Sequence, residues 1–251
     1  MSNPVTYGAV FADVYDEWYG ASDDVNAVID LLCEESPRSV LELGVGTGRI
    51  ALALARALAD RMVPRHARVE GIDESPEMLA ILHAKDTTHR VRTHLGDMVR
   101  EQPAGPFDLV VCSYNTLFNL TDAQLQAECI ANAATRLTPS GRLVIDACVI
   151  DPTAPASGRE HHRRGPWELT TSTRFNPGTG AIHGVTVSTH DDGRIVERPF
   201  HLSYRAPNEL DAMCSRVGLH LIARHSSWQK APFDDSCARH VSVYATYAEP
   251  R

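Results

Sequence analysis

The sequence lacks any close pair of cysteines. Its cysteines are scattered along 251 residues and never form a C-x-x-C motif. Such spacing argues against a zinc site and against a disulfide framework, and it fits reduced thiols in the cytoplasm. We therefore expect no metal ion and no covalent cross-link. The six cysteines are Cys33, Cys112, Cys129, Cys148, Cys214 and Cys237.

The chain also lacks the run of about 20 apolar residues that spans a bilayer. Its first residues carry no basic segment followed by an apolar stretch, so we expect a cytoplasmic protein that stays out of membranes. Basic residues are in deficit, with 24 Lys and Arg against 32 Asp and Glu and a formal net charge of -8. This charge repels a phosphate backbone, which argues against nucleic acid as a partner.

Helical and extended patterns alternate through the first 150 residues. The length and the 43% hydrophobic content suit one globular domain with an insertion. A parallel sheet with helices on both faces, a doubly wound Rossmann-like α/β fold, follows from this alternation. The helices are predicted over 7–18, 22–35, 50–58, 76–84 and 123–136, and the strands over 38–43, 69–72, 90–95, 107–112 and 141–147.

The pattern changes after Ile150. Residues 151–166 are polar, rich in Pro and Gly and without periodicity, so they predict a mobile loop. Three alternating segments over 167–175, 182–190 and 195–204 follow, joined by Asn-Pro-Gly and Asp-Asp-Gly turns. We expect an inserted antiparallel platform of three strands that covers a ligand cleft. The rest of the chain predicts a helix over 207–217, ended by Gly218, and strands over 219–226 and 239–247.

These changes divide the chain into three parts. A ligand-binding core over 1–150 begins with an amino-terminal lid helix. The β insertion covers 151–206, and 207–251 completes the core sheet.

A glycine-rich turn follows the first predicted core strand. The segment Leu-Glu-Leu-Gly-Val-Gly-Thr-Gly places Gly44, Gly46 and Gly48 where the strand turns into a helix, so the backbone can approach a ligand. The spacing is G-x-G-x-G, whereas the dinucleotide fingerprint is G-x-G-x-x-G. Glu42 precedes these glycines and disfavours a diphosphate. It suits the ammonium group of the methionyl end of S-adenosylmethionine.

Polar residues also follow the next three strands. Asp73 ends the second strand, where a carboxylate can accept hydrogen bonds from both ribose hydroxyls. Asp97 follows the third, where it can accept from an adenine amino group beside the polarizable Met98. A polar and aromatic run begins at Cys112 after the fourth strand. Together these strand ends predict an adenosine site.

At this point the sequence resembles the class I S-adenosylmethionine-dependent methyltransferases. The matching motifs are LELGVGTGR, GIDESPEML, GDM and FDLVVCSYNTL, in order, within residues 38–148. The segment YGAVFADVYDEWY resembles the aromatic lid helix of the subgroup with glycine N-methyltransferase and the sugar N,N-dimethyltransferases of natural-product pathways. The resemblance implies a seven-stranded sheet whose last strand is antiparallel. It also implies S-adenosyl-L-methionine as methyl donor and S-adenosyl-L-homocysteine as product.

The resemblance further implies a small-molecule acceptor methylated on nitrogen or oxygen in secondary metabolism. It places Tyr15 at the cofactor carboxylate, with Tyr19 one turn later on the same face. It assigns the remaining cofactor contacts to Glu42, Gly44 and Gly46 at the methionyl end, Asp73 at the ribose, Glu74 and Met78 around the adenosine, Asp97 and Met98 at the adenine, and Ser113 near the sulfonium.

Several alternatives remain open at this point. Tyr15 and Tyr19 could simply be core aromatics, Asp13 and Asp16 are expected on a solvated face, and the residues around His161 are expected to be solvated. No side chain stands out as a catalytic base. A nicotinamide-dependent oxidoreductase and a non-catalytic cofactor-binding module are the competing functions, and a homodimer is possible.

Overall fold

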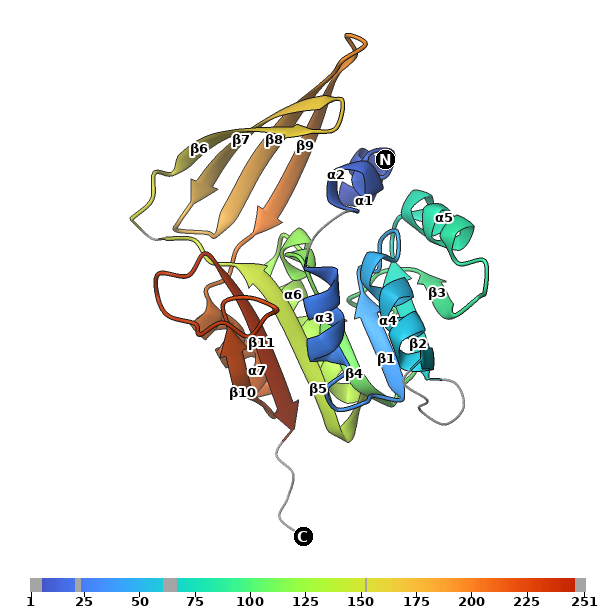
Figure 1. Ribbon diagram of the computed structural model, residues 1–251. Coiled ribbons are helices and arrows are strands. Elements are labelled where there is room, and N and C mark those ends of the chain that lie inside the picture. The colour runs from blue at the N-terminus through green and yellow to red at the C-terminus, as the bar shows by residue number, and fades with distance from the viewer. Residues whose placement is uncertain (1–5, 21–23, 61–66, 152, 247–251) are drawn as a thin grey trace.

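The computed structural model describes residues 6–20, 24–60, 67–151 and 153–246. Its main sheet has seven strands in the order β10-β11-β5-β4-β1-β2-β3 (Figure 1). Neighbouring strands pair in parallel except β11, which is antiparallel to both β5 and β10. The expected doubly wound sheet with one reversed strand is confirmed. The strands are β1 (Ser39–Leu43), β2 (Arg68–Asp73), β3 (Val91–Leu95), β4 (Phe107–Cys112), β5 (Leu137–Cys148), β10 (Leu219–His225) and β11 (Arg239–Thr246).

Helices cover both faces of this sheet. One apolar cluster joins α3 and α4 to it, and a second joins α6 and α7 from the other side. Strand β1 pairs with both β2 and β4, so the strand order reverses there and the carboxyl ends open a crevice. The helices are α3 (Val25–Leu32), α4 (Arg49–Asp60), α5 (Pro76–Lys85), the 3-10 helix η1 (Thr116–Asn119), α6 (Ala123–Arg136) and α7 (Pro207–Arg216).

Local signals explain where several elements begin and end. The Ser75 hydroxyl accepts a hydrogen bond from the Met78 N–H at 3.2 Å, and Pro76 occupies the first turn, so α5 starts there. Gly218 has φ +80° just after α7, as a helix-ending glycine should. The helix predicted over 22–35 would begin on residues 22–23, which lie outside the described part of the chain.

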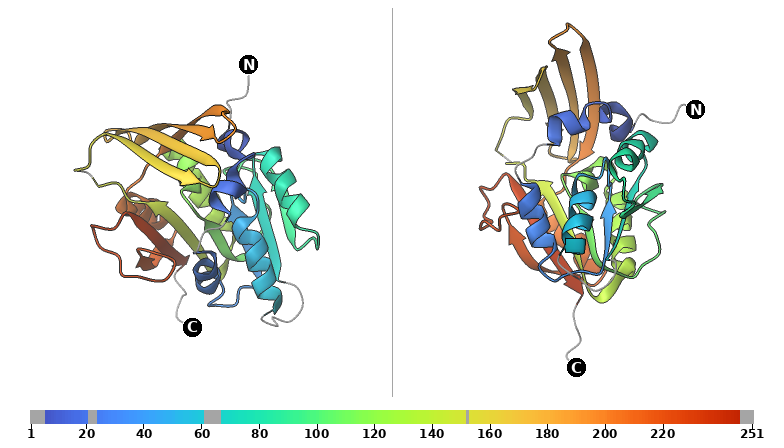
Figure 2. Two further views of the ribbon diagram at one scale, coloured as in Figure 1. Left: turned by 45° about the horizontal axis from the view of Figure 1, so that its top comes forward. Right: turned by 45° about the vertical axis from the view of Figure 1, so that its right-hand side comes forward.

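A second, four-stranded antiparallel sheet stands over the carboxyl ends of the core strands (Figures 1 and 2). We call it the platform. Its strands are β6 (Ser157–Arg164), β7 (Trp167–Asn176), β8 (Ala181–His190) and β9 (Ile195–Ser203).

The predicted antiparallel platform is present with its three expected strands, β7, β8 and β9, but the prediction of a mobile loop over 151–166 was wrong, because this segment contains the fourth strand, β6. Strand β6 pairs with β7 along its whole length, from Ser157↔Arg174 to Arg164↔Trp167. Every side chain of β6 is exposed, so it shows no alternation of apolar and polar residues. Backbone pairing holds this edge strand, and its charged residues discourage further strand addition.

The predicted amino-terminal helix is broken into two short helices, α1 (Tyr7–Phe11) and α2 (Tyr15–Tyr19). They lie beside β9 of the platform and over the core, as both views in Figure 2 show. Phe11, Trp18, Met78, Trp167 and Leu169 form a third apolar cluster there. We call these two helices the lid.

Among the described residues, no helix has both the length and the apolar character needed to cross a membrane.

Candidate functional site

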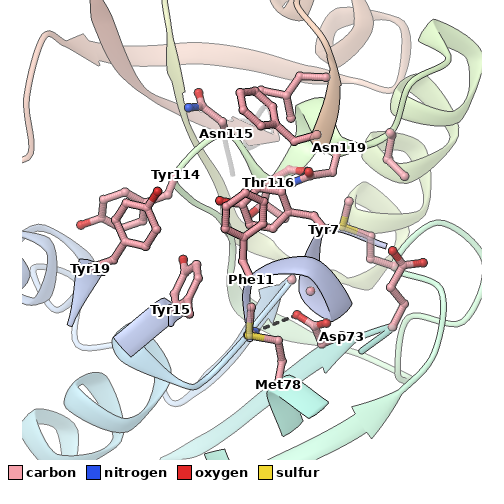
Figure 3. Close-up of a pocket in the computed structure, with 18 of the residues that line it drawn as sticks. Tyr7, Phe11, Tyr15, Tyr19, Asp73, Met78, Tyr114, Asn115, Thr116 and Asn119 are labelled. Carbon is pink, nitrogen blue, oxygen red and sulfur yellow. Dashed lines mark hydrogen bonds between the residues drawn. The ribbon is translucent and has the colours of Figure 1, made fainter. Parts of the chain in front are cut away.

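A pocket of about 280 Å³ lies between the carboxyl ends of β1, β2 and β4, the lid and the inner face of the platform (Figure 3). Nine of the predicted cofactor residues line it. They are Tyr15, Tyr19, Gly44, Gly46, Asp73, Glu74, Met78, Asp97 and Met98. The fold thus brings together residues that are up to 83 positions apart in the sequence, from Tyr15 to Met98.

The glycine turn forms the floor of this pocket. Gly44 has φ +66° and Gly46 has φ +53°, conformations that side chains disfavour. A Cβ on Gly44 would lie 2.3 Å from the Thr116 Cγ2 atom, so this position has no room for one. A Cβ on Gly46 would meet nothing within 4 Å, because the backbone there borders open space. The turn is therefore shaped to present its backbone to a ligand.

Asp73 ties this turn to the start of α5. Its carboxylate accepts from the Gly46 N–H at 2.8 Å and from the Ser75 N–H at 2.9 Å, one bond on each oxygen. A carboxylate has about four acceptor positions, so about two remain for a ligand. Burial raises the pKa of Asp73, while the bonds from Ser75 and Gly46 oppose this shift. The group is fixed in place with acceptor capacity to spare.

The pocket has an acidic lining. Asp73, Glu74 and Asp97 line it, and none of the described lining residues is Lys, Arg or His. Burial, and then the charges of Asp73 and Asp97, raise the pKa of Glu74. Such a lining favours a cationic ligand and disfavours a diphosphate, which argues against a nicotinamide dinucleotide.

Glu42 and Ser113 lie beneath the pocket and do not line it. Both are 5% exposed. The Glu42 Oε2 atom has no hydrogen-bond partner within the described structure. Burial raises the pKa of Glu42 from 4.5 to about 8, although Arg49 opposes this shift. The Glu42 carboxyl, with its Oε2 atom unpaired in the described structure, would gain from a cation above it.

The raised pKa of Glu42 predicts a pH-dependent stability. The folded protein binds this proton more tightly than the unfolded chain does, so the free energy of unfolding falls as pH rises from about 4.5 to about 8. We expect the melting temperature of the cofactor-free protein to fall more between pH 6 and pH 8 than that of Glu42→Gln, which cannot ionise. Thermal melts monitored by circular dichroism at several pH values test this. Parallel curves for the two proteins would contradict it.

Tyrosines of the lid converge on one side of the pocket. The Tyr15 and Tyr19 rings lie 5.1 Å apart, and the Tyr7 and Tyr19 side chains are hydrogen-bonded. Burial raises the pKa of all three, most for Tyr7, so each hydroxyl keeps its proton and can donate. Arg49 donates to the Tyr19 carbonyl at 2.9 Å and stacks 3.8 Å from the Tyr114 ring centroid. We did not predict Tyr7 or Arg49, although Arg49 closes the glycine motif.

The opposite end of the pocket, far from Asp73 and Met78, is neutral (Figure 3). Asn115 and Asn119 from the β4–α6 connection face Thr171 and Thr186 of the platform, whose hydroxyls lie 2.9 Å apart. We call this end the acceptor side. The platform residues of the pocket were not predicted from the sequence. The alternation of apolar and polar residues indicates which face of a strand points inward, but not whether that face borders a ligand pocket or another part of the protein. The remaining members are Leu120, Phe200 and Leu202.

The lid is clamped to both the platform and the core. Arg198 of β9 is 4% exposed and binds both carboxylate oxygens of Asp13, at 2.7 and 2.8 Å. Asp16 accepts from the Thr47 hydroxyl at 2.6 Å and from Lys85 at 2.7 Å. Asp13 is exposed, as expected, and Asp16 is half-buried, yet both carboxylates also bind basic residues. Trp167 adds a bond to Glu17 at 2.9 Å.

Among the described residues, no group of three or more His, Cys, Asp or Glu side chains could hold a metal ion.

The doubly wound sheet with one reversed strand and the glycine turn agree with the resemblance to the class I S-adenosylmethionine-dependent methyltransferases. Residues 40–141 match a family described as a methyltransferase domain. This part of the chain is therefore similar to a methyltransferase domain, and the structural likenesses below extend over the rest of the chain.

Two proteins that are similar over more than half of this chain are methyltransferases. The CcbJ methyltransferase from Streptomyces caelestis superposes with a TM-score of 0.87 at 29% identity, covering 98% of this chain and 100% of that one. The cypemycin N-terminal methyltransferase of a Streptomyces species is 29% identical over 149 residues, 58% of each chain.

A third likeness concerns the fold alone. CalS10 from Micromonospora echinaspora, an amino pentose methyltransferase of calicheamicin biosynthesis, has a TM-score of 0.70 at 21% identity and covers 97% of this chain and 99% of that one. The chain matches between 30% and 66% of the length of its curated relatives.

Proposed function

We propose that this methyltransferase acts on an amine nitrogen of a small molecule. The neutral acceptor side is the observation that supports this most directly. Its described residues are Asn115, Asn119, Leu120, Thr171, Thr186, Phe200 and Leu202, and none of them is a base near neutral pH.

Because these residues offer no base, an amine suits this site as the nucleophile better than a hydroxyl does. S-adenosylmethionine supplies a methyl group already activated by its sulfonium. An unprotonated amine carries its own lone pair and needs only alignment and exclusion of water. A hydroxyl needs a group that removes its proton, such as a histidine or a carboxylate. The amides and threonine hydroxyls of the acceptor side can orient an amine but cannot deprotonate an alcohol.

Within the same proposal, the acidic half of the pocket holds the cofactor. Asp73 would accept from the ribose hydroxyls with its two remaining acceptor positions, and Asp97 with Met98 would contact the adenine. Tyr15 and Tyr19 would donate to the carboxylate of the methionyl end, beside Gly44 and Gly46. Glu74 and Met78 would border the adenosine. Glu42 and Ser113 would act from beneath, Glu42 by favouring the cationic end.

One relative supports the choice of nitrogen. The name of the cypemycin N-terminal methyltransferase indicates an amine as the methyl acceptor of that protein. We therefore propose secondary metabolism as the setting. None of the six cysteines, all of which lie in the described part of the chain, forms a disulfide, which supports a reducing compartment such as the cytoplasm.

A matched acceptor panel tests the chosen atom. Purified protein is incubated with methyl-labelled S-adenosylmethionine and amino sugars, amino acids and cyclic secondary amines, each beside the analogue with a hydroxyl in place of the amine. We expect label transfer to one or more amines, at a rate that rises with pH until the amine is fully unprotonated. Transfer to the hydroxyl analogues at comparable rates would overturn the choice of nitrogen. Binding of NAD(H) without S-adenosylmethionine in calorimetric titrations would overturn the cofactor.

A further inference from the structure

Two consecutive residues after β4 adopt the left-handed conformation although neither is glycine. Tyr114 has φ +53° and Asn115 has φ +64°. Such conformations are uncommon for residues with a side chain and persist only when their surroundings fix them. Both residues line the pocket, with Asn115 on the acceptor side (Figure 3). The turn therefore stores strain where the acceptor would bind.

Asp146 of β5 fixes the backbone of this turn. Its side chain is 1% exposed and accepts from the Tyr114 N–H at 2.8 Å, while its carbonyl accepts from the Asn115 N–H at 3.1 Å. The Asn115 Oδ1 atom in turn accepts from the Cys148 N–H at 2.6 Å. Asp146 thus holds both left-handed residues, and Cys148 fixes the orientation of the Asn115 amide.

Arg239 of β11 completes the arrangement from outside the pocket. It binds both carboxylate oxygens of Asp146, through Nη2 at 2.7 Å and through Nε. Its guanidinium also lies 5.0 Å from the centroid of the Tyr114 ring. The Tyr114 hydroxyl donates to Asp24 at 2.9 Å, and Arg239 lies 3.4 Å from the same carboxylate. Arg239 therefore contacts both the Asp146 carboxylate, which holds the turn, and the side chain of Tyr114, which belongs to the turn.

We propose that Arg239 and Asp146 are positioning residues that hold the Tyr114–Asn115 turn in its left-handed conformation and so place the Asn115 side chain for the acceptor. Neither residue is among those lining the pocket. The effect on the acceptor depends on the proposed function, whereas the effect on the turn does not. Arg239 lies 124 positions after Asn115 and outside every motif that carries the methyltransferase resemblance.

Hydrogen exchange measured by mass spectrometry tests the effect on the turn. In Arg239→Met we expect exchange at the Tyr114, Asn115 and Cys148 amides to become about tenfold faster, because Asp146 loses its orienting partner. Arg239→Lys keeps the positive charge but not the paired bonds, so it should give an intermediate increase. Arg224→Met is the matched control. Arg224 lies on β10, binds Asp211 of α7 and does not contact the turn. Unchanged exchange at the three amides in Arg239→Met would overturn the proposal.

Arg239→Met leaves the Asp146 charge buried and could prevent folding. In that case Arg239→Met with Asp146→Asn removes both charges together, and faster exchange at the turn is still expected because the paired bonds are gone. Wild-type exchange in the folded double variant would also overturn the proposal.

Kinetics with an amine from the acceptor panel test the effect on binding. We expect the KM of Arg239→Met for that amine to rise about tenfold, while the dissociation constant for S-adenosylhomocysteine changes less than about threefold. An equal loss of both affinities would show a general structural role and would contradict positioning of the acceptor. If no amine is methylated, the proposed function fails, and the exchange experiment alone still decides whether Arg239 holds the turn.

Discussion

Asp73→Ala is expected to weaken binding of S-adenosylhomocysteine about a hundredfold, measured by isothermal titration calorimetry. Hydrogen bonds to a charged group contribute about 1.5–3 kcal/mol each, and a hundredfold change corresponds to about 2.8 kcal/mol. The same carboxylate holds the Gly46 and Ser75 N–H groups, so its loss also loosens the turn that shapes the pocket. The lost bonds to the ligand and the loosened turn both weaken the affinity for S-adenosylhomocysteine.

Two further variants serve as controls for the loss of affinity in Asp73→Ala. Asp60→Ala removes an exposed carboxylate at the end of α4 and should bind like the wild type. Asp73→Asn keeps the shape but offers one oxygen in place of two, so it cannot accept from both N–H groups and a ribose as well. Its affinity should lie between those of wild type and Asp73→Ala. Wild-type affinity in Asp73→Ala would show that this pocket is not the cofactor site.

Arg198→Met is expected to release the lid from the platform. The substitution removes two bonds to Asp13 and one to the Val10 carbonyl from a buried position. If docking weakens by about 2 kcal/mol and only the docked lid binds, the affinity for S-adenosylhomocysteine falls by up to about thirtyfold. Chymotrypsin should cleave the aromatic lid faster in this variant, which limited proteolysis with mass spectrometry can measure.

Arg163→Met serves as the matched control for the lid. Arg163 of β6 pairs at 2.8 Å with Asp191, and both are exposed, so its loss should affect neither affinity nor cleavage. Normal affinity and normal cleavage of Arg198→Met would mean that apolar packing around Trp18 and Trp167 holds the lid without this ion pair.

The carboxyl ends of the core strands were predictable because their signals are local. Buried strands are short apolar runs, and the residues that follow them must lie at one edge of a parallel sheet. Asp73 and Asp97 were placed by this rule, and both line the pocket. Glu42 was also expected there, but its side chain lies beneath the turn. Strand alternation does not show which face of a doubly covered sheet a ligand occupies.

Strand β6 escaped prediction for a different reason. Its sequence Ser-Gly-Arg-Glu-His-His-Arg-Arg has neither apolar residues nor alternation, and only pairing with β7 makes it extended. Pairing is a property of the partner strand, so no pattern within these eight residues could reveal it.

The sequence by itself determined the class of the fold, the glycine turn and the methyl donor, because hydrophobic periodicity and turn chemistry act over a few neighbouring residues. Tertiary structure alone decided that Arg198 binds Asp13, that Asp146 and Arg239 hold Tyr114 and Asn115, and that the acceptor side is neutral. The two ion pairs, Arg239–Asp146 and Arg198–Asp13, join residues 93 and 185 positions apart. They depend on how completed elements pack, and packing has no signature in any short stretch of the chain.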